Sequence, residues 1–489
     1  MEKKLYFVGI DAVPLWLLQE MKDEKGMEGF KELLNSDSII NLESTLPPMT
    51  GPAWPSIYTG LEPREHGVPD FFEMKKDYTP ELAFYDSRKF PPFWKALSDR
   101  GKKCLIVTPA TDITLPTNME YDIITGFPLP AETNNAEMEK LMKKYEFDGE
   151  PDIEKDIKSG KMSEETASKR FAESARKRIQ IAREMMAKKD YDFVYVCFTE
   201  TDRIHHFVAN KPNRKDYLLP IYAEMGAFVS ELLALAKKDN SALILVSDHG
   251  TQQIKMKFLL NSWLIKKGYV KLKDSIEKSI NADAGKSNIK YELREKLLKT
   301  GLRRVYDKMP HAVKSATSKA VGSALSGTGG GKYIRTHLFD FEMPQTTAFA
   351  AISNDPVSTI WVNDNRLKNG IVTEKDKKAL KAKLTRELKA IRGEDGKPVI
   401  ANIFDGDSYY GKNTQFIAAD LLIEATPGYT LDIFYHSKET NFMLPEKAKS
   451  GDHTRKGIFG FYPKRLYKKK DKTMRLTEVK KVVMDYFSS

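Results

Sequence analysis

The sequence predicts an α/β fold, a mainly parallel β-sheet with helices on both faces. Short apolar runs, rich in β-branched and aromatic residues, are too continuous for half-exposed antiparallel strands and are typical of strands buried on both faces. Longer segments with helical periodicity lie among these runs. Alternation of the two patterns along the chain indicates βαβ units, which build parallel sheets.

Six apolar runs are the expected strands, at residues 5–10, 104–108, 193–198, 243–247, 358–362 and 421–423. The expected helices lie at residues 93–100, 165–188 and 217–237. Pro and Gly punctuate residues 46–69 and 126–130, which we expect to form ordered loops near the strand ends.

A basic segment at residues 264–341 breaks this alternation. Apolar residues recur at helical spacing through 289–309 with Lys and Arg between them, which predicts a basic amphipathic helix, and a Gly-rich run follows at 323–332. We therefore divide the chain into a core of residues 1–263 and 342–489 and a basic, largely helical insertion of residues 264–341. The insertion is expected to act as a lid or as a docking segment.

The formal net charge of +11, from 79 Lys and Arg against 68 Asp and Glu, suggests a nucleic-acid or anionic-membrane partner. The charge is uneven, with +9 in residues 285–335, +6 in residues 464–489 and −4 in the remainder. Contact with an anionic membrane or nucleic acid through 286–335 and 464–489 is therefore one prediction, and a solvated Lys/Arg-rich surface is the alternative. The mildly acidic remainder has to be interpreted from its own motifs.

The composition, 41% hydrophobic and 30% charged, excludes a disordered, collagen-like or disulfide-framework protein. Cys104 and Cys197 lie in apolar runs, so we interpret both as small buried hydrophobes, which fits a reducing compartment. The N-terminal residues lack the long apolar stretch and the cleavage site of a signal peptide, and no uncharged apolar run approaches about 18 residues. We expect a cytoplasmic protein with no transmembrane segment.

Acidic residues and histidines follow three of the expected strands. Asp11 ends the first run, Asp202 and His206 follow residues 193–198, and Asp248-His249 follows residues 243–247. The carboxyl ends of parallel strands meet at one edge of the sheet, so these side chains are expected to converge. Taken singly, Asp11 is also explained as a helix cap, and each histidine as an ordinary surface or core residue.

The spacing within the third motif supports a metal site. Asp202 and His206 stand four residues apart, so on a helix both side chains share one face, whereas His205 points elsewhere and is left outside the site. His453 lies beside an aspartate in a Gly-containing stretch that also reads as a simple turn. Carboxylates and imidazoles are a ligand set suited to zinc or manganese, and the number of donors is enough for two ions.

Thr50 is the candidate nucleophile. It is followed by Gly51 and Pro52, and Pro is favoured in the first turn of a helix, so Thr50 is expected near a helix N-terminus. One interpretation is that Thr50 only caps this helix. The other is that the amides and dipole of the helix receive an anion there, while a nearby metal activates the hydroxyl.

Taken in order, these motifs resemble the alkaline phosphatase superfamily, and within it the type I phosphodiesterase/nucleotide pyrophosphatase family. The residues that carry the resemblance are Gly9-Ile10-Asp11, Thr50, Thr59-Gly60 with His66-Gly67, Asp202-x-x-x-His206, Asp248-His249-Gly250 and His453. They cover both ends of the chain, about 1–260 and 340–489, and their joint order is more specific than any single motif.

The resemblance implies an alkaline phosphatase-like core that binds two divalent metal ions, usually zinc in this family, with manganese as the alternative. One ion would be held by Asp11, Asp248, His249 and the Thr50 oxygen, and the other by Asp202, His206 and His453. Thr50 would attack phosphorus and form a covalent phosphothreonine, with the amide of Gly51 as a substrate-binding donor. The implied enzyme is a metal-dependent hydrolase of phosphodiester or pyrophosphate bonds acting on an anionic phosphate ester.

Two departures from the family pattern leave the substrate class open. Residues 68–71 contain no Asn after His66-Gly67, and Ala53 stands where the family tends to have Asn, so a phosphate-binding amide is missing. Phosphomonoesterase, phosphonate hydrolase and phosphotransferase remain alternatives on the same core, and so does a metal-stabilised protein that binds anionic surfaces. The sulfatase signature is absent around Thr50. The natural substrate, the metal and the oligomeric state are not specified by these motifs.

Overall fold

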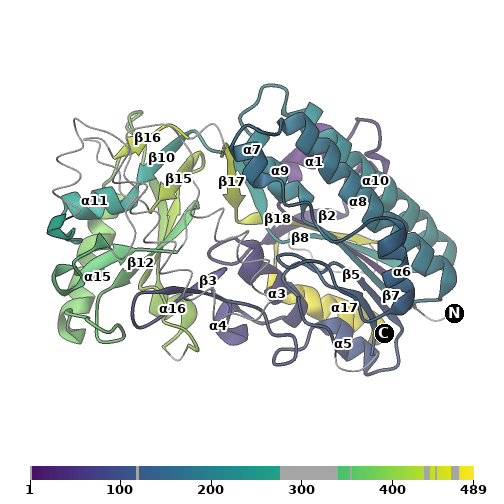
Figure 1. Cartoon of the computed structure of the whole chain (residues 1–489), viewed down its shortest axis with the longest axis horizontal. Coiled ribbons are helices and arrows are strands. Elements are labelled where there is room, and N and C mark those ends of the chain that lie inside the picture. The colour runs from purple at the N-terminus through teal and green to yellow at the C-terminus, as the bar shows by residue number, and fades with distance from the viewer. Residues whose placement is uncertain are drawn as a thin grey trace.

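An eight-stranded sheet organises the larger of two lobes in this computed structural model (Figure 1). The structure describes residues 3–116, 120–275, 340–352, 355–412, 414–433, 441–445, 449–463 and 473–488. In spatial order the strands of the sheet are β19 (Thr473–Arg475), β2 (Ile39–Glu43), β18 (Lys456–Tyr462), β8 (Ala242–Ser247), β1 (Leu5–Ile10), β7 (Phe193–Phe198), β5 (Cys104–Val107) and β6 (Asp122–Ile124). Only β18 runs antiparallel to its neighbours, so the prediction of a mainly parallel sheet is confirmed.

Helices cover both faces of this sheet, as predicted (Figure 1). Side chains alternate along each strand, so in β1 Val8 faces one apolar core while Phe7 faces the other. The first core is closed by α1 (Leu15–Met21), α2 (Glu28–Asn35), α6 (Ala136–Lys144), α8 (Glu164–Lys188) and α10 (Arg214–Asp239). The second is closed by α3 (Thr50–Thr59), α5 (Phe93–Ser98) and α17 (Val479–Ser488). Cys104 and Cys197 are buried free thiols on the strands, as interpreted from the sequence.

The smaller lobe contains an antiparallel sheet, which the sequence did not predict. Its strands, in spatial order, are β11 (Ala348–Ala350), β12 (Val357–Val362), β14 (Leu421–Ala425) and β13 (Ile400–Asp405). A second sheet of this lobe joins β15 (Tyr429–Asp432), β10 (Met256–Leu259) and β16 (Phe442–Met443). The helices α11 (Leu260–Lys266), α15 (Glu374–Lys389) and α16 (Gly406–Tyr410) flank these sheets (Figure 1).

The prediction that residues 358–362 and 421–423 are strands of the parallel sheet was wrong, because β12 and β14 pair antiparallel in the smaller lobe. The physical reason is that this sheet is also covered on both sides. Leu421 and Ile423 face one apolar cluster, whereas Leu422 between them faces another. A strand buried on both faces has a continuous apolar sequence whichever way its neighbours run.

The predicted insertion falls mostly outside the described residues. Residues 276–339 are not described, and they contain the expected amphipathic helix at 289–309, the Gly-rich run and all of the proposed docking segment 286–335. The described flanks pack in the smaller lobe, where Leu272 and Phe341 form an isolated bridge and are both buried. The division into a core and an insertion therefore stays a prediction.

Within the C-terminal segment, the described residues 473–488 are part of the larger lobe. Residues 464–472 are not described, but β19 joins the eight-stranded sheet and α17 packs against α3 and α5. Val479, Val483 and Tyr486 bury their side chains in the second core. Residues 473–488 carry a net charge of only +1, and the other +5 of the basic stretch 464–489 belongs to residues 464–472, which are not described.

In the described part of the chain, α10 is long and apolar enough to cross a membrane by length and composition, with a mean hydropathy of 1.5 over its most apolar window. Half of that window is buried, and α10 packs on α8 and α2 as a core helix does. Glu224 and Glu231 interrupt its apolar sequence, so α10 contains no uncharged apolar stretch of about 18 residues.

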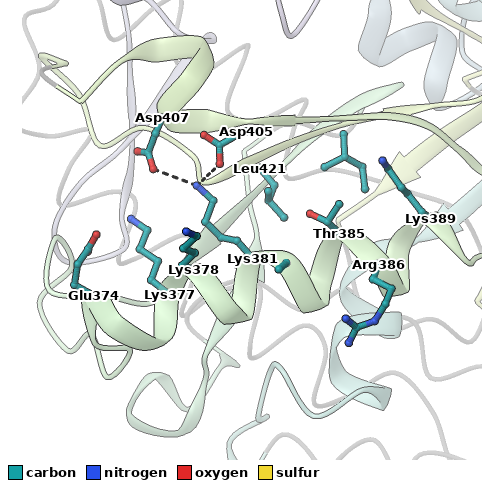
Figure 2. A pocket seen from close by; sticks show the side chains of 12 residues that line it. Glu374, Lys377, Lys378, Lys381, Thr385, Arg386, Lys389, Asp405, Asp407 and Leu421 are labelled. Atoms are coloured by element: carbon teal, nitrogen blue, oxygen red, sulfur yellow. Dashed lines mark hydrogen bonds and ion pairs between the residues drawn. The ribbon is translucent and has the colours of Figure 1, made fainter.

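A groove of about 810 Å³ lies on the smaller lobe between α15 and β13 (Figure 2). Its basic side chains belong to Lys377, Lys378, Lys381, Arg386 and Lys389. Lys381 is held by the two carboxylates of Asp405 and Asp407, at 2.5 and 3.2 Å. The groove contains none of the residues predicted to form the metal site.

Candidate active site

All seven residues predicted for the site come together at the carboxyl edge of the central strands. Asp11 follows β1, Asp248 and His249 follow β8, and Asp202 and His206 lie on α9 (Glu200–Val208), directly after β7. Thr50 is the first residue of α3, and His453 lies on β17 (Gly451–Thr454), which pairs with β9 (Gly250–Gln253) beside the larger lobe (Figure 1). Segments far apart in the sequence therefore meet at one place, as the strand-end rule predicts.

Asp11 is fixed by hydrogen bonds from three directions. Its backbone N–H donates to the carbonyl of Phe198 at 2.8 Å, and its own carbonyl accepts from the Thr201 hydroxyl at 2.6 Å. The indole N–H of Trp54 donates to Oδ2 at 3.1 Å. The carboxylate is almost completely buried, at 1% exposure, so its position is determined by these contacts.

The Thr50 hydroxyl points at Asp11 and not at the backbone of its own helix. Its Oγ1 lies 3.2 Å from Oδ2 of Asp11 and 3.5 Å from Nε2 of His249. Met49 is the N-cap residue and extended, and it makes no side-chain capping bond. The alternative that Thr50 only caps α3 is therefore wrong, because its hydroxyl faces the cluster of acidic and imidazole groups.

Asp248 and His249 are positioned by the residues around them at the end of β8. The Ser247 hydroxyl accepts from the Val13 N–H at 2.7 Å and donates to the His249 carbonyl at 2.8 Å. The Nδ1 atom of His249 lies 3.1 Å from the carbonyl oxygen of Gly250. Its Nε2 atom is thereby directed at Asp11 and Asp248, at 3.3 and 3.4 Å.

A second group forms between α9 and β17. Nε2 of His206 lies 3.4 Å from Asp202, and Nε2 of His453 lies 3.3 Å from the other oxygen of the same carboxylate. Nδ1 of His206 contacts the Gly451 carbonyl at 3.0 Å, which orients the ring. His205, left outside the site by the sequence argument, turns away and bonds the Tyr222 hydroxyl at 2.9 Å.

The pKa values in the cluster are shifted because its carboxylates and imidazoles are buried and close together. Burial, with Asp248 and Asp202 nearby, raises the pKa of Asp11 well above its usual range, and burial raises the pKa of Asp248 to about 7. Burial lowers the pKa of His249 to about 3, so this imidazole is neutral near pH 7. Burial opposes the charge of His453, but Asp355 and Asp202 outweigh it and raise the pKa of His453 to about 9.

The donors present fit metal ions. Three groups of described residues have ligand atoms within 4.8 Å of one another, and two of them consist of predicted site residues: Asp202 with His206 and His453, and Asp11 with Asp202 and His249. Oδ2 of Asp248 is buried and has no hydrogen-bond partner, as expected of an atom that binds a cation. The Nδ1 atoms of His206 and His249 contact carbonyls, which leaves their Nε2 atoms to face the carboxylates, an arrangement common among metal ligands.

The positions that depart from the family pattern lie at the start of α3 or pack against it. A Cβ on Gly51 would lie 3.2 Å from the Phe71 nitrogen and 3.3 Å from its ring, so Phe71 packs directly on the start of α3. Ala53 is fully buried. His66, the last residue of α4 (Pro63–His66), is buried and its Nε2 contacts the Ser56 hydroxyl at 3.0 Å, so it ties α4 to α3. Residues 46–69, expected as loop, thus contain two helices.

Sequence reasoning missed two kinds of residue at this site. Trp54 holds Asp11, and a signal was present, because Trp54 lies four residues after Thr50 and therefore on the same helical face. Asp355 contacts both His453 and Lys449; Lys449 stands four residues before His453, but no spacing links Asp355 to the motifs. Asp355 precedes β12 in the smaller lobe, so only the tertiary fold brings it to the site.

Comparison with known proteins agrees with this architecture. A model of the type I phosphodiesterase / nucleotide pyrophosphatase family matches residues 5–455. Phosphonoacetate hydrolase from Sinorhizobium meliloti 1021, in complex with phosphonoformate, has a TM-score of 0.56 and 13% identity, covering 99% of this chain and 96% of that one. Human ectonucleotide pyrophosphatase/phosphodiesterase 5 has a TM-score of 0.51 and 13% identity, covering 100% and 95%. No curated protein matches the chain in sequence.

The fold and the site define an enzyme of the alkaline phosphatase superfamily, a phosphohydrolase. The chain belongs to the type I phosphodiesterase/nucleotide pyrophosphatase family, whose model spans most of its length. At this level of identity the structural likeness shows the fold, and the resemblance predicted from the ordered motifs is confirmed.

Proposed function

We propose that the protein is a two-metal hydrolase that cleaves phosphodiester or pyrophosphate bonds through a covalent phosphothreonine at Thr50. The single observation that supports this most is the placement of the Thr50 hydroxyl, 3.2 Å from Asp11 and 3.5 Å from His249 at the first residue of α3. A hydroxyl used only for folding would bond to the helix backbone, as Thr59 does to Pro55.

The residues divide into two proposed metal sites. Asp11, Asp248, His249 and the Thr50 oxygen would hold one ion, and Asp202, His206 and His453 would hold the other, with zinc favoured and manganese as the alternative. When bound, the ions would lower the pKa of the hydroxyl and stabilise charge on the phosphoryl oxygens. The raised pKa of Asp11 and of Asp248 supports this assignment, since closely spaced buried carboxylates favour a cation.

In the first chemical step, Oγ1 of Thr50 forms a bond to phosphorus while the bond from phosphorus to the leaving oxygen breaks. Thr50 gives up its hydroxyl proton in this step, and the electron pair of the broken bond departs with the leaving oxygen, which acquires a proton. The amides at the start of α3, among them that of Gly51, would donate to the phosphoryl oxygens, and the positive end of the helix dipole would add to this. Asp11, held by Trp54, fixes the direction of the hydroxyl.

In the second step, water attacks phosphorus and releases the phosphoryl group, which restores the Thr50 hydroxyl. Burial of Thr50, at 5% exposure, limits the access of bulk water to the intermediate. The direction of water attack is opposite to Thr50, because displacement at phosphorus is in line.

A second candidate is hydrolysis of a phosphate monoester or a phosphonate on the same core. The observation that favours it is the absence of an amide side chain at residues 68–71 and at Ala53, with the Phe71 ring packed on Gly51 instead. Without that donor, a diester loses one hydrogen bond of the kind that is worth roughly 3 kcal/mol in anion-binding sites.

Two further predictions of the sequence remain predictions. One is contact with anionic partners through residues 286–335 and 464–489, and the other is a cytoplasmic location.

The test compares substrates on protein loaded with zinc or manganese. Initial rates are measured on bis(4-nitrophenyl) phosphate, 4-nitrophenyl phosphate and phosphonoacetate, and preference for the diester supports the first candidate. Thr50→Ala is expected to lower kcat on the order of a thousandfold or more, since it removes the nucleophile. Acid quenching followed by mass measurement is expected to show one added phosphoryl group in the wild-type protein, still esterified to 4-nitrophenol when the substrate is the diester, and none in Thr50→Ala.

Thr59→Val is the matched control, because Thr59 is a second buried threonine on the same helix and its hydroxyl bonds only within the segment. It should retain wild-type kcat within a few-fold. Full activity of Thr50→Ala would overturn the nucleophile assignment, and preference for the monoester or phosphonoacetate would favour the second candidate.

A further inference from the structure

A lysine bridges two carboxylates directly beside the histidine at the end of β17. The ammonium of Lys449 lies 3.3 Å from Oδ1 of Asp355 and 3.3 Å from Oδ1 of Asp452. Both carboxylates are buried, with 9% and 0% exposed side chains, whereas the lysine side chain is 30% exposed. The lysine therefore reaches inward from the surface to a pair of buried negative charges.

This group borders the proposed metal site through His453. Oδ1 of Asp355 lies 3.8 Å from Nδ1 of His453, and no hydrogen bond is formed by that buried nitrogen. The corresponding nitrogens of His206 and His249 contact backbone carbonyls. His453 is thus the histidine of this site whose outer nitrogen faces a carboxylate.

Asp452 is held firmly in the same group. The Thr430 hydroxyl donates to its Oδ2 at 2.5 Å, and the backbone N–H of His453 donates to its Oδ1 at 3.1 Å. Asp355 precedes β12, and Thr430 lies on β15, so both come from the smaller lobe. The contacts around Lys449 consequently connect the smaller lobe to a ligand of the proposed metal site.

The donors of Asp355, Asp452 and His453 lie within 4.8 Å of one another, as a metal site requires. We propose that the Lys449 ammonium is a built-in cation that takes the place of a third metal ion here and, through Asp355, positions the His453 ring. The inference rests on the proposed two-metal function. A compact ammonium can neutralise two carboxylates as a divalent ion would, and a carboxylate behind a ligating imidazole fixes its orientation.

Two other lysines provide matched controls. Lys377 lies 2.8 Å from Asp364 and 2.8 Å from Asp420, two buried carboxylates. Lys381 lies between Asp405 and Asp407 in the groove of the smaller lobe (Figure 2). Among the described residues, neither pair belongs to a cluster of metal-ligand type. Loss of either lysine therefore removes the same kind of ion pair without opening a place for a metal.

The experiment counts bound zinc per protein chain by elemental analysis after equilibration and gel filtration. Wild-type protein is expected to hold two ions, Lys449→Met three, and Lys377→Met and Lys381→Met two each. Lys449→Arg restores a cation and should return the count to two. Two ions in folded Lys449→Met would overturn the inference and leave the proposed function intact, whereas no bound zinc in the wild-type protein would overturn the proposed function itself.

A second variant tests the positioning role and does not depend on Lys449→Met being folded. Asp355→Asn is expected to weaken one of the two zinc affinities about 10- to 100-fold, measured by competition with a chromogenic chelator. Asp364→Asn, which removes a carboxylate beside Lys377, should leave both affinities unchanged. Equal zinc affinities in Asp355→Asn and wild-type protein would show that Asp355 does not position His453.

Discussion

The indole N–H of Trp54 donates a hydrogen bond to Oδ2 of Asp11 over 3.1 Å, and both side chains are buried. Trp54 lies one helical turn after Thr50 on α3, so the Asp11 carboxylate contacts both the hydroxyl and the indole. One short helix therefore supplies the candidate nucleophile and the group that orients its carboxylate neighbour.

Replacing the indole tests this relationship. Trp54→Phe keeps an aromatic ring in the core but removes the N–H, so the Asp11 carboxylate loses its side-chain donor. We expect metal affinity to fall about 10- to 100-fold, as is typical when a partner of a ligand is removed. Isothermal titration of metal into the apo protein measures it. Trp94→Phe, in the same core and away from Asp11, serves as the control, and equal losses in the two variants would contradict the prediction.

Gly9 is explained by the same indole. A Cβ at this position would lie 2.7 Å from Cη2 of Trp54 and 3.0 Å from Sγ of Cys197, closer than side chains approach one another. Gly9→Ala should therefore displace the indole and lower the free energy of unfolding by about 1–3 kcal/mol, a usual cost of overpacking. Denaturant titration measures the loss. The double variant Gly9→Ala/Trp54→Phe lacks the clashing atom, so its loss of unfolding free energy should be smaller than the sum of the losses in the two single variants. A loss equal to that sum would argue against the clash.

The sequence could predict the site better than the fold around it. Asp11 and Asp248 directly follow an apolar run and Asp202 comes four residues after one, and in a parallel sheet the ends of such runs meet at one edge, so local pattern and topology agree. β12 and β14 could not be assigned in the same way. Continuous apolar sequence reports burial on both faces, which antiparallel strands also show when a lobe covers both sides.

The residues that surround the site histidines could not be predicted from the sequence, for a different reason. Asp355 and Lys449 are separated by 94 positions and by elements of both lobes, and they meet only because the smaller lobe packs against β17. Trp54 could have been recognised from its spacing to Thr50, but that spacing also fits a tryptophan that only fills the core. The direction of the side chain and its tertiary contacts, not the residue type, decide whether such a tryptophan contacts the site or only fills the core.

A buried ion pair supports the helix that carries Asp202 and His206. Nη1 of Arg178 on α8 lies 2.7 Å from Oε2 of Glu200, the first residue of α9, and both side chains are completely buried. Arg178→Met leaves the Glu200 carboxylate uncompensated and is expected to cost about 3–5 kcal/mol of unfolding free energy. Arg178→Met/Glu200→Met removes both charges and should recover most of that loss. Thermal unfolding compares the two, and a double variant no more stable than the single one would contradict this account.

Asp112, after β5, makes stability depend on pH. Burial raises its pKa to about 7, and its side chain is 0% exposed. A carboxyl with a raised folded-state pKa binds its proton more tightly when folded, so its stabilising contribution is present below about pH 4 and is lost as pH rises through about 7. Asp112→Asn cannot titrate, so between pH 5.5 and pH 8 its stability should rise relative to wild type by on the order of 2 kcal/mol. Denaturant titrations at both pH values measure this difference.

Asp23→Asn is the control above pH 5. Lys31 holds the pKa of the exposed Asp23 carboxyl below its usual value, so this carboxyl stays ionised in the folded and in the unfolded protein. A difference between Asp112→Asn and wild type that does not change with pH would show that Asp112 is ionised in the folded protein.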